Sequence, residues 1–434
     1  MQTKAKEKIN IVTLGCAKNL VDSEVLMTQL KGNKKDVFHQ REDINPDIVI
    51  INTCGFIDKA KQESIDTILK HAKEKEDGII KKLYVTGCLS ERYKDDLKTD
   101  IPEVDGFYGT RDLPELLKNF EAKYRNELLG DRIITTDSHY AYLKISEGCD
   151  RPCSFCAIPL MRGRHISKPI DQIILEAKNL VRNGVREIML IAQDSTYYGI
   201  DIYKKRAMSE LLKKLSDVEG LDWIRIHYAY PAGFPMDIIE VMRERDNICN
   251  YLDIPLQHGS TNMLKIMKRG ITREKTDELI KNIRDINPEI ALRTTLIAGH
   301  PGETERDFQE MYDFVERSQF DRLGIFTYSH EEGTSAHKLE DDVPEQVKRS
   351  RSNKIMALQQ KISIEKNKNK VGKTVKVLVD RVDANNYYGR TEQDSPEVDN
   401  EVIIPSKEMH LRVGDFYDVK ITDSKEYDLI GKVD

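Results

Sequence analysis

The chain has 434 residues, of which 33% are charged and 7% aromatic, and its formal net charge is −6. This length predicts two to four domains, each with its own core, and the composition excludes a disordered chain. No apolar run approaches the ~18 residues that cross a bilayer, and residues 1–12 lack a signal-peptide core. We therefore expect a cytoplasmic protein with no membrane partner.

The net charge and the expected compartment also indicate which partners the protein binds and what its cysteines do. Proteins that bind nucleic acid mainly through phosphates are usually basic, so the acidic net charge favours a basic protein partner over RNA. In the cytoplasm the seven cysteines should be reduced thiols. Clustered cysteines are then interpreted as metal ligands or catalysts.

The first ~125 residues alternate short apolar strands with amphipathic helices. Strands are predicted at residues 9–16, 47–54 and 82–88, and a helical pattern follows each one. This alternation is typical of a doubly wound parallel α/β domain, expected at residues 1–130.

Each of these three strands ends at a cysteine: Cys16, Cys54 and Cys88. The carboxyl ends of parallel strands lie on one edge of the sheet, where ligands bind, so the three thiols should converge there. One such cysteine would be interpreted as a small buried residue. Three at the same structural point, each beside a Gly or Thr, favour a shared metal site.

A second alternating series starts near residue 140. Its predicted strands are 141–149, 186–194, 223–231, 251–258, 291–302 and 322–329. Six such units indicate a partial (β/α)6 barrel at residues 135–365, short of the eight units of a closed barrel, with its active site at the C-terminal mouth. At residues 368–434 the period becomes two, which predicts a small antiparallel β-barrel.

The first barrel strand leads into Cys149, Cys153 and Cys156, spaced CxxxCxxC. Three thiolates are one short of a closed zinc site, and His165 remains an alternative fourth ligand. An iron–sulfur cube held by three thiolates would instead leave one iron free for a small ligand. Cys249 shares no spacing with the others and is expected to be a buried core thiol.

CxxxCxxC after the first strand of a partial barrel resembles the radical S-adenosylmethionine (SAM) superfamily. The resemblance implies that the free iron binds the amino and carboxylate groups of SAM. It also implies that an electron from the cluster cleaves SAM to a 5′-deoxyadenosyl radical. Segments at the expected strand ends match the superfamily's SAM contacts: Gln193 and Asp194 for the methionyl amino group, Gln257 near the ribose, and Gly299, Gly302 and Glu303 by the adenine.

Two three-cysteine sites followed by a small β domain resemble the methylthiotransferases over essentially the whole chain. The resemblance implies two [4Fe–4S] clusters, the second of which handles sulfur, a second SAM as methyl donor, and a TRAM-type C-terminal domain. The segment LGCAKNLVDSE, residues 14–24, is similar to the branch that modifies the β-carbon of an aspartate in the twelfth protein of the small ribosomal subunit. This implies that ribosomal protein as substrate, docking through the acidic TRAM-like domain, an electron donor such as flavodoxin or ferredoxin, and a sulfur donor.

Charge offers an independent check on the substrate. From residue 371 onward there are 9 Lys and Arg against 14 Asp and Glu, a net charge of −5. A domain that grips tRNA should be basic, so tRNA adenosine is the less favoured substrate of the same mechanism. A non-catalytic iron–sulfur carrier would not need a SAM pocket. Arg162, Arg164 and His165 follow the cysteine loop, where they could contact cofactor or substrate, but basic loop residues usually face solvent, and that interpretation is favoured.

Overall fold

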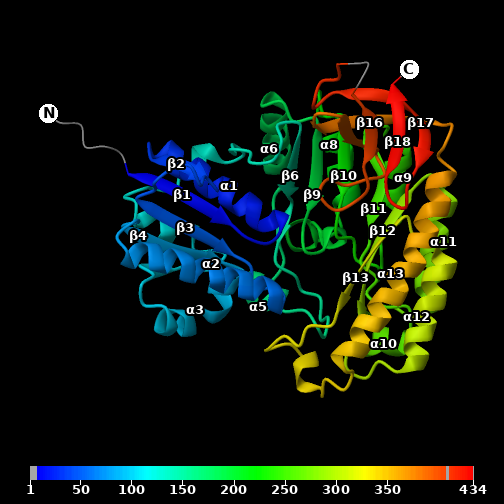
Figure 1. The fold of residues 1–434 in the computed structure, drawn as a ribbon, viewed down its shortest axis with the longest axis horizontal. Helices are drawn as coiled ribbons and strands as arrows, with labels where there is room; N and C mark the ends of the chain where they lie inside the picture. The colour runs from blue at the N-terminus through cyan, green and yellow to red at the C-terminus, as the bar shows by residue number, and fades with distance from the viewer. Residues whose placement is uncertain (1–6, 407–409, 434) are drawn as a thin grey trace.

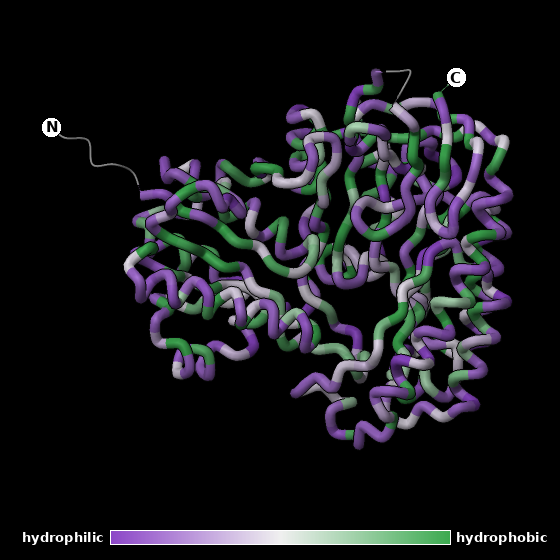
Figure 2. The backbone as a smooth tube through the Cα atoms, viewed as in Figure 1, coloured by the Kyte–Doolittle hydropathy of each residue, from purple (hydrophilic) through white to green (hydrophobic). Residues whose placement is uncertain are grey.

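The computed structural model describes residues 7–406 and 410–433. In Figure 1 the N-terminal domain lies beside a larger strand-and-helix domain, and the C-terminal strands pack against one end of that larger domain. Figure 2 shows hydrophobic residues along the inner strands and hydrophilic residues along outer helices. None of the described helices is both long and apolar enough to cross a membrane.

The N-terminal domain is a five-stranded parallel sheet with strand order β2-β1-β3-β4-β5. Its strands are β1 (Lys8–Thr13), β2 (Asp36–His39), β3 (Ile48–Thr53), β4 (Lys82–Gly87) and β5 (Gly106–Phe107). Its helices are α1 (Ala17–Gly32), α2 (Asp58–Glu76), α3 (Cys88–Asp100) and α4 (Leu113–Lys118). Separate apolar cores on the two faces confirm the predicted doubly wound sheet. The edge strands β2 and β5 escaped prediction because neither carries a long apolar run.

The central domain is a six-stranded parallel sheet with order β6-β9-β10-β11-β12-β13, and it confirms the predicted partial barrel. Its strands are β6 (Tyr140–Lys144), β9 (Glu187–Ile191), β10 (Trp223–Ile226), β11 (Ile248–Asp253), β12 (Ala291–Ala298) and β13 (Arg322–Thr327). The helices around it are α5 (Ile158–Arg162), α6 (Ile170–Arg182), α7 (Ile200–Tyr203), α8 (Met208–Ser216), α9 (Asp237–Glu244), α10 (Thr261–Ile266), α11 (Arg273–Ile286), α12 (Glu305–Ser318) and α13 (Glu345–Lys368). The large apolar core lies between these strands and helices, which leaves the inner face of the sheet for function.

The C-terminal domain is a closed five-stranded barrel with order β14-β15-β16-β18-β17. Its strands are β14 (Thr374–Val382), β15 (Asn386–Arg390), β16 (Val402–Pro405), β17 (Phe416–Ser424) and β18 (Leu429–Val433). Four strand pairs are antiparallel as predicted, but β16 and β18 pair in parallel. Five strands cannot alternate direction all the way around a closed ring, so one parallel pair is unavoidable.

The loop between β15 and β16 joins the two barrels. Asp394 of this loop accepts a hydrogen bond from Arg322 Nε at 2.9 Å, at the first residue of β13. Ser395 Oγ lies 3.0 Å from His227 Nε2, just beyond β10. Arg390 pairs with Glu187, the first residue of β9, at 2.8 Å. Two of these contacts lie at the N-terminal ends of central strands, whereas the contact with His227 lies at the carboxyl end of β10, so the loop reaches from one end of the sheet toward the barrel mouth.

Candidate functional site

The three N-terminal cysteines lie at one edge of their sheet. Cys16 precedes α1, Cys54 directly follows β3, and Cys88 begins α3 straight after β4. Strands β1, β3 and β4 are neighbours, and the strand order reverses at β1, where ligands bind in open α/β sheets. A Cβ on Gly15 would lie 2.6 Å from Cys54 Cβ and 2.8 Å from its Sγ, so the Cys16 and Cys54 loops are in contact.

Asn19 holds these three loops together. Its fully buried Nδ2 donates to the carbonyls of Leu14, at 2.8 Å, and Thr53, at 3.0 Å. Its Oδ1 lies 3.7 Å from Cys88 Sγ. One side chain therefore contacts the segments that carry all three cysteines.

The barrel cysteines lie on the loop between β7 (Ser146–Glu147) and α5, at the carboxyl end of β6. Cys149 Sγ accepts from the backbone N–H of Arg151 at 3.4 Å, and Cys153 Sγ accepts from Arg269 Nη1 at 3.1 Å. Cys156 N donates to the Cys153 carbonyl at 3.3 Å, which closes a tight turn. This is the mouth of the barrel, where the first strand was expected to deliver them.

Neither trio forms a site for a single ion. Across residues 7–406 and 410–433, no three His, Cys, Asp or Glu side chains are grouped closely enough to hold one metal ion. In a cube each thiolate binds a different iron, so three cysteines stand farther apart than the ligands of one ion. His165 Nε2 lies 2.9 Å from Ser167 Oγ, so the zinc alternative gains no support. Three-thiolate donor sets on neighbouring loops do fit iron–sulfur clusters.

Three of the site thiols have pKa values well above neutral pH in the absence of a bound cation. Burial raises the pKa of Cys88 to about 12, of Cys149 to about 11 and of Cys156 to about 12. Only thiolates bind iron, so cluster assembly must displace these protons. Cys249 is buried in the core, where the sequence placed it.

Arg162, on the helix after the barrel cysteines, contacts the N-terminal trio, and the favoured of its two interpretations, that it faces solvent, is wrong. It is 3% exposed, and its Nε donates to Cys88 Sγ at 3.3 Å. Its Nη1 donates to Asp22 at 2.6 Å and to Glu147 at 3.1 Å. These partners lie in both domains and far apart in sequence, so no local pattern could predict them. Arg164 is exposed, as expected.

Gln193 and Asp194 follow β9 and lie beside the barrel cysteines. Gln193 Nε2 donates to Glu147 Oε1 at 2.9 Å, while its Oε1 is buried and has no partner among the described residues. Asp194 pairs with Arg151 Nε at 2.7 Å. A cavity of about 100 Å³ lies between Cys149, Arg151 and Asp194. Gln193 therefore keeps a free acceptor, whereas the Asp194 charge is already paired.

The remaining predicted SAM contacts lie on two neighbouring strand ends. Gln257 has a left-handed φ of +76° and bridges β12 at Leu296. Such strain in a non-glycine residue clusters at functional sites. Gly299 and Gly302 have φ of +77° and +81°, and Glu303 accepts from Gly299 N at 2.8 Å and pairs with Arg351 at 2.7 Å. Glu303 therefore holds this turn together from within.

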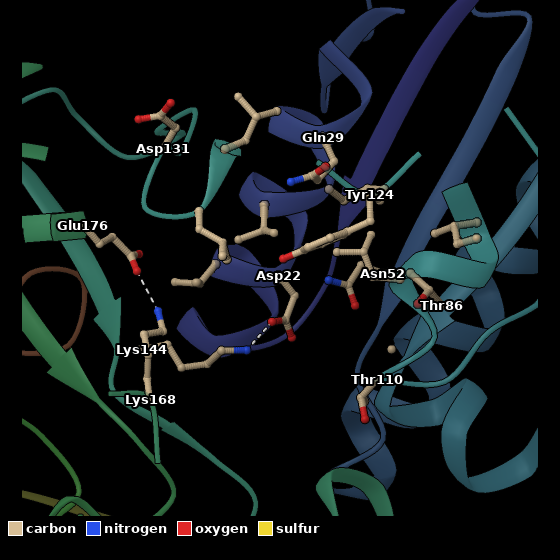
Figure 3. A pocket seen from close by; sticks show the side chains of 18 of the residues that line it. Asp22, Gln29, Asn52, Thr86, Thr110, Tyr124, Asp131, Lys144, Lys168 and Glu176 are labelled. Atoms are coloured by element: carbon tan, nitrogen blue, oxygen red, sulfur yellow. Dashed lines mark hydrogen bonds and ion pairs between the residues drawn. The ribbon is translucent and has the colours of Figure 1, made fainter. Parts of the chain in front are cut away.

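The N-terminal domain contacts the barrel at two further places. Glu331, beyond β13, is 2% exposed and pairs with Lys61 at 3.0 Å and Arg92 at 2.8 Å. On the α1 side, a cavity of about 240 Å³ has the Asp22–Lys144 ion pair in its wall (Figure 3). Together with Arg162, these contacts fix the N-terminal cysteine edge over the barrel mouth.

Comparison with known proteins matches three family models. They are the Radical SAM superfamily over residues 143–315, the uncharacterized protein family UPF0004 over 8–109, and the TRAM domain over 371–433. A ribosomal protein uS12 methylthiotransferase of Cytophaga hutchinsonii is 59% identical over 99% of this chain and 98% of its own. Those of Christiangramia forsetii and Bacteroides thetaiotaomicron are 57% and 53% identical, over 100% and 99% of this chain and 96% and 98% of their own.

The chain belongs to the ribosomal protein uS12 methylthiotransferase family. It is a radical SAM methylthiotransferase that uses SAM and [4Fe–4S] clusters. Among solved structures, the radical SAM methyltransferase TsrM of Kitasatospora setae superimposes with a TM-score of 0.56 at 14% identity, over 74% of this chain and 73% of its own. The radical enzyme OxsB gives 0.53 at 13% identity, over 82% of this chain and 56% of its own. These likenesses show a shared fold.

Four residues near the two cysteine sites were not predicted from the sequence as site residues: Lys18, Asn19, Arg151 and Arg269. Lys18 and Asn19 follow Cys16 in LGCAKN, and Arg151 lies inside the CxxxCxxC loop. Their closeness in sequence to these cysteines could have predicted that they belong to the sites. Arg269 lies over a hundred residues from Cys153, and only the fold brings it there.

Proposed function

We propose that this enzyme replaces one hydrogen on the β-carbon of an aspartate of ribosomal protein uS12 with a methylthio group. The observation that carries the proposal is the contact of Arg162, on the helix that follows the barrel cysteines, with Cys88 of the N-terminal three-cysteine site. Identity of 53–59% to uS12 methylthiotransferases, over nearly all of each chain, supports the substrate. Because ribosomal proteins work in the cytoplasm, we place the reaction there.

The residues divide the chemistry between the domains. The target C–H bond has no useful acidity, so a side-chain base cannot open it, and such chemistry belongs to a cofactor that the protein positions. When bound, SAM and the cluster at Cys149, Cys153 and Cys156 supply hydrogen-atom abstraction, and SAM also supplies the methyl group. We assign Cys16, Cys54 and Cys88 to a second [4Fe–4S] cluster that handles sulfur.

The surrounding residues position SAM and exclude water. We assign Gln193, whose carbonyl oxygen has no partner among the described residues, to the SAM amino group. Asp194 would act through Arg151, which it pairs with, and Gln257 would lie near the ribose. The turn holding Gly299, Gly302 and Glu303 would lie by the adenine.

Further parts of the proposal concern organisation and partners. We propose domains at residues 1–130, 135–365 and 368–434, and docking of the basic substrate on the acidic C-terminal barrel. Reduction of the radical cluster requires an electron donor such as flavodoxin or ferredoxin. Repeated turnover requires a sulfur donor.

The test uses anaerobically purified enzyme with intact clusters. Purified uS12 is incubated with SAM, a reductant and sulfide, and its mass is then measured. We expect a gain of one CH₂S unit, localised by fragmentation to one aspartate. Unchanged uS12 in the presence of intact clusters contradicts the proposal. Loss of a methylthio-adenosine from tRNA in cells lacking the enzyme would instead identify tRNA as the substrate.

A further inference from the structure

Lys18 is a buried cation at the barrel mouth with no carboxylate partner among the described residues. It lies in the first turn of α1, two residues beyond Cys16, and is 8% exposed. Its Nζ lies 3.4 Å from the centroid of the Tyr228 ring, and no described Asp or Glu oxygen lies within 4.0 Å of it. Buried charges are normally paired, so this ammonium lacks the usual compensation.

Three neighbouring cations at the mouth have carboxylate partners. Lys144 pairs with Asp22 and Glu147, Arg151 pairs with Asp194, and Arg162 pairs with Asp22 and Glu147. Arg269 also has no carboxylate partner among the described residues, but it donates to Cys153 Sγ at 3.1 Å and to the Pro255 carbonyl at 2.6 Å. Lys18 Nζ differs from these cations because it has neither a carboxylate nor another hydrogen-bond acceptor among the described residues.

The aromatic platform beneath Lys18 is held rigidly. Tyr228 has a left-handed φ of +60°, which is rare for a bulky residue. Its N–H donates to Asp253 at 3.1 Å and its carbonyl accepts from Ser195 N at 3.1 Å. Asp253 is itself neutralised by Arg293 at 2.9 Å. The carboxylate that holds the Tyr228 backbone is thus already paired, and Lys18 is left to attract another anion.

The position of this ammonium suits the reacting group. Tyr228 lies just beyond β10 at the mouth of the radical barrel, whereas Lys18 belongs to the domain that carries Cys16, Cys54 and Cys88. In an aspartate the β-carbon is bonded directly to the carboxylate carbon. An anchor on the carboxylate therefore fixes the β-carbon one bond away.

We propose that Lys18 binds the side-chain carboxylate of the substrate aspartate and selects it against neutral side chains. This rests on the function proposed above. The carboxylate of SAM is the competing anion, because the Tyr228 carbonyl accepts from Ser195 N, next to Asp194. Arg151 and Arg269 contact Cys149 and Cys153 directly, so we assign the SAM carboxylate to those two cations. The substrate is therefore the anion that Lys18 is placed to meet.

The experiment measures binding by the cluster-loaded enzyme. Its ligands are purified uS12 and a uS12 in which the modified aspartate is replaced by asparagine. Wild type should bind the aspartate protein at least about tenfold more tightly. Lys18→Met should lose that preference by weakening only aspartate binding, while Lys18→Arg retains most of it. Lys31→Met, at the exposed end of the same helix, is the matched control and should bind as wild type does.

Iron content, unfolding midpoint and SAM affinity are measured on every variant. The wild-type comparison needs no variant, so equal binding of the two uS12 proteins overturns the inference even if Lys18→Met does not fold. A Lys18→Met enzyme that still prefers aspartate also overturns it, as does one that loses SAM affinity instead. A wild type that neither binds nor modifies uS12 defeats the proposed function, and this inference falls with it.

Discussion

At the scale of single residues, Gly15 meets two demands that other residues cannot meet together. Its φ is +91°, a conformation that side chains disfavour, and a Cβ there would collide with Cys54. Gly78 has a similar φ of +73°, but a Cβ there would meet nothing within 4 Å. An alanine at Gly78 therefore tests backbone strain alone, whereas an alanine at Gly15 adds a collision with a proposed cluster ligand.

We expect Gly15→Ala to lose about half of the enzyme's iron, because the added methyl displaces Cys54 while the barrel cysteines stay in place. Gly78→Ala should keep full iron and cost only the backbone strain, on the order of 1 kcal/mol. Iron and sulfide quantitation after anaerobic reconstitution measures the effect. Full iron in Gly15→Ala would show that Cys54 is not a ligand or that its loop can yield.

At the scale of elements, α1 organises the N-terminal site through Asn19. Replacing this side chain leaves the buried carbonyl of Thr53 and the partly buried carbonyl of Leu14 without this donor, and each loss costs about 1–3 kcal/mol. Asn33, at the other end of α1, also donates to two carbonyls, those of Gln29 and Lys123, at 2.8 and 2.9 Å. It lies at a partly solvated position, where water can replace it.

We predict that Asn19→Ala lowers the free energy of unfolding by about 2–4 kcal/mol and depletes the N-terminal cluster. Asn33→Ala should lose about 1 kcal/mol and keep its iron. Urea denaturation and iron quantitation give both values. Equal losses in the two variants would mean that Asn19 acts as an ordinary helix residue.

At the scale of the whole molecule, buried charges hold the C-terminal barrel to the central barrel. Burial favours the neutral form of Glu187, but Arg390 and Arg225 outweigh it and hold the pKa of Glu187 below its usual value. The same balance, with Arg322, lowers the pKa of Asp394. A carboxyl with a lowered folded pKa stabilises the fold above its unfolded pKa and loses that contribution as pH falls through the folded one.

His227 adds to this acid sensitivity. Its pKa is lowered to about 3, chiefly by burial and with help from Arg225, Arg293 and Lys18, while Asp253 opposes them. The unfolded histidine takes up a proton below about pH 6.5, while the folded one stays neutral down to about pH 3. Falling pH therefore favours unfolding across this interval.

We predict that the urea midpoint falls steadily from pH 7 to pH 4. His227→Gln should flatten the part above about pH 4.5, where the carboxylates are still charged. Comparison of the two proteins at each pH cancels any shared acid effect on the clusters. Parallel curves for wild type and His227→Gln would show that this histidine is not buried in its neutral form.

The sequence by itself determined the three-part architecture and the two cysteine trios. Strand and helix periodicity is a local property, and parallel strands that end in Cys16, Cys54 and Cys88 must bring them to one edge. The CxxxCxxC loop is likewise contained within eight residues. Local sequence patterns were enough to predict the strands, the helices and the cysteine loop, because each of these forms from residues that are close together in the chain.

Only the tertiary structure decided which charges meet across the domains. Arg162 was expected in solvent but is buried against Cys88, and Lys18 lies over Tyr228, more than two hundred residues away. Glu303 turned out to hold its own turn, and the parallel β16–β18 pair followed from closing an odd number of strands. Ion pairs and ring closure depend on distances that no sequence period encodes, because they arise only when separately folded elements pack together.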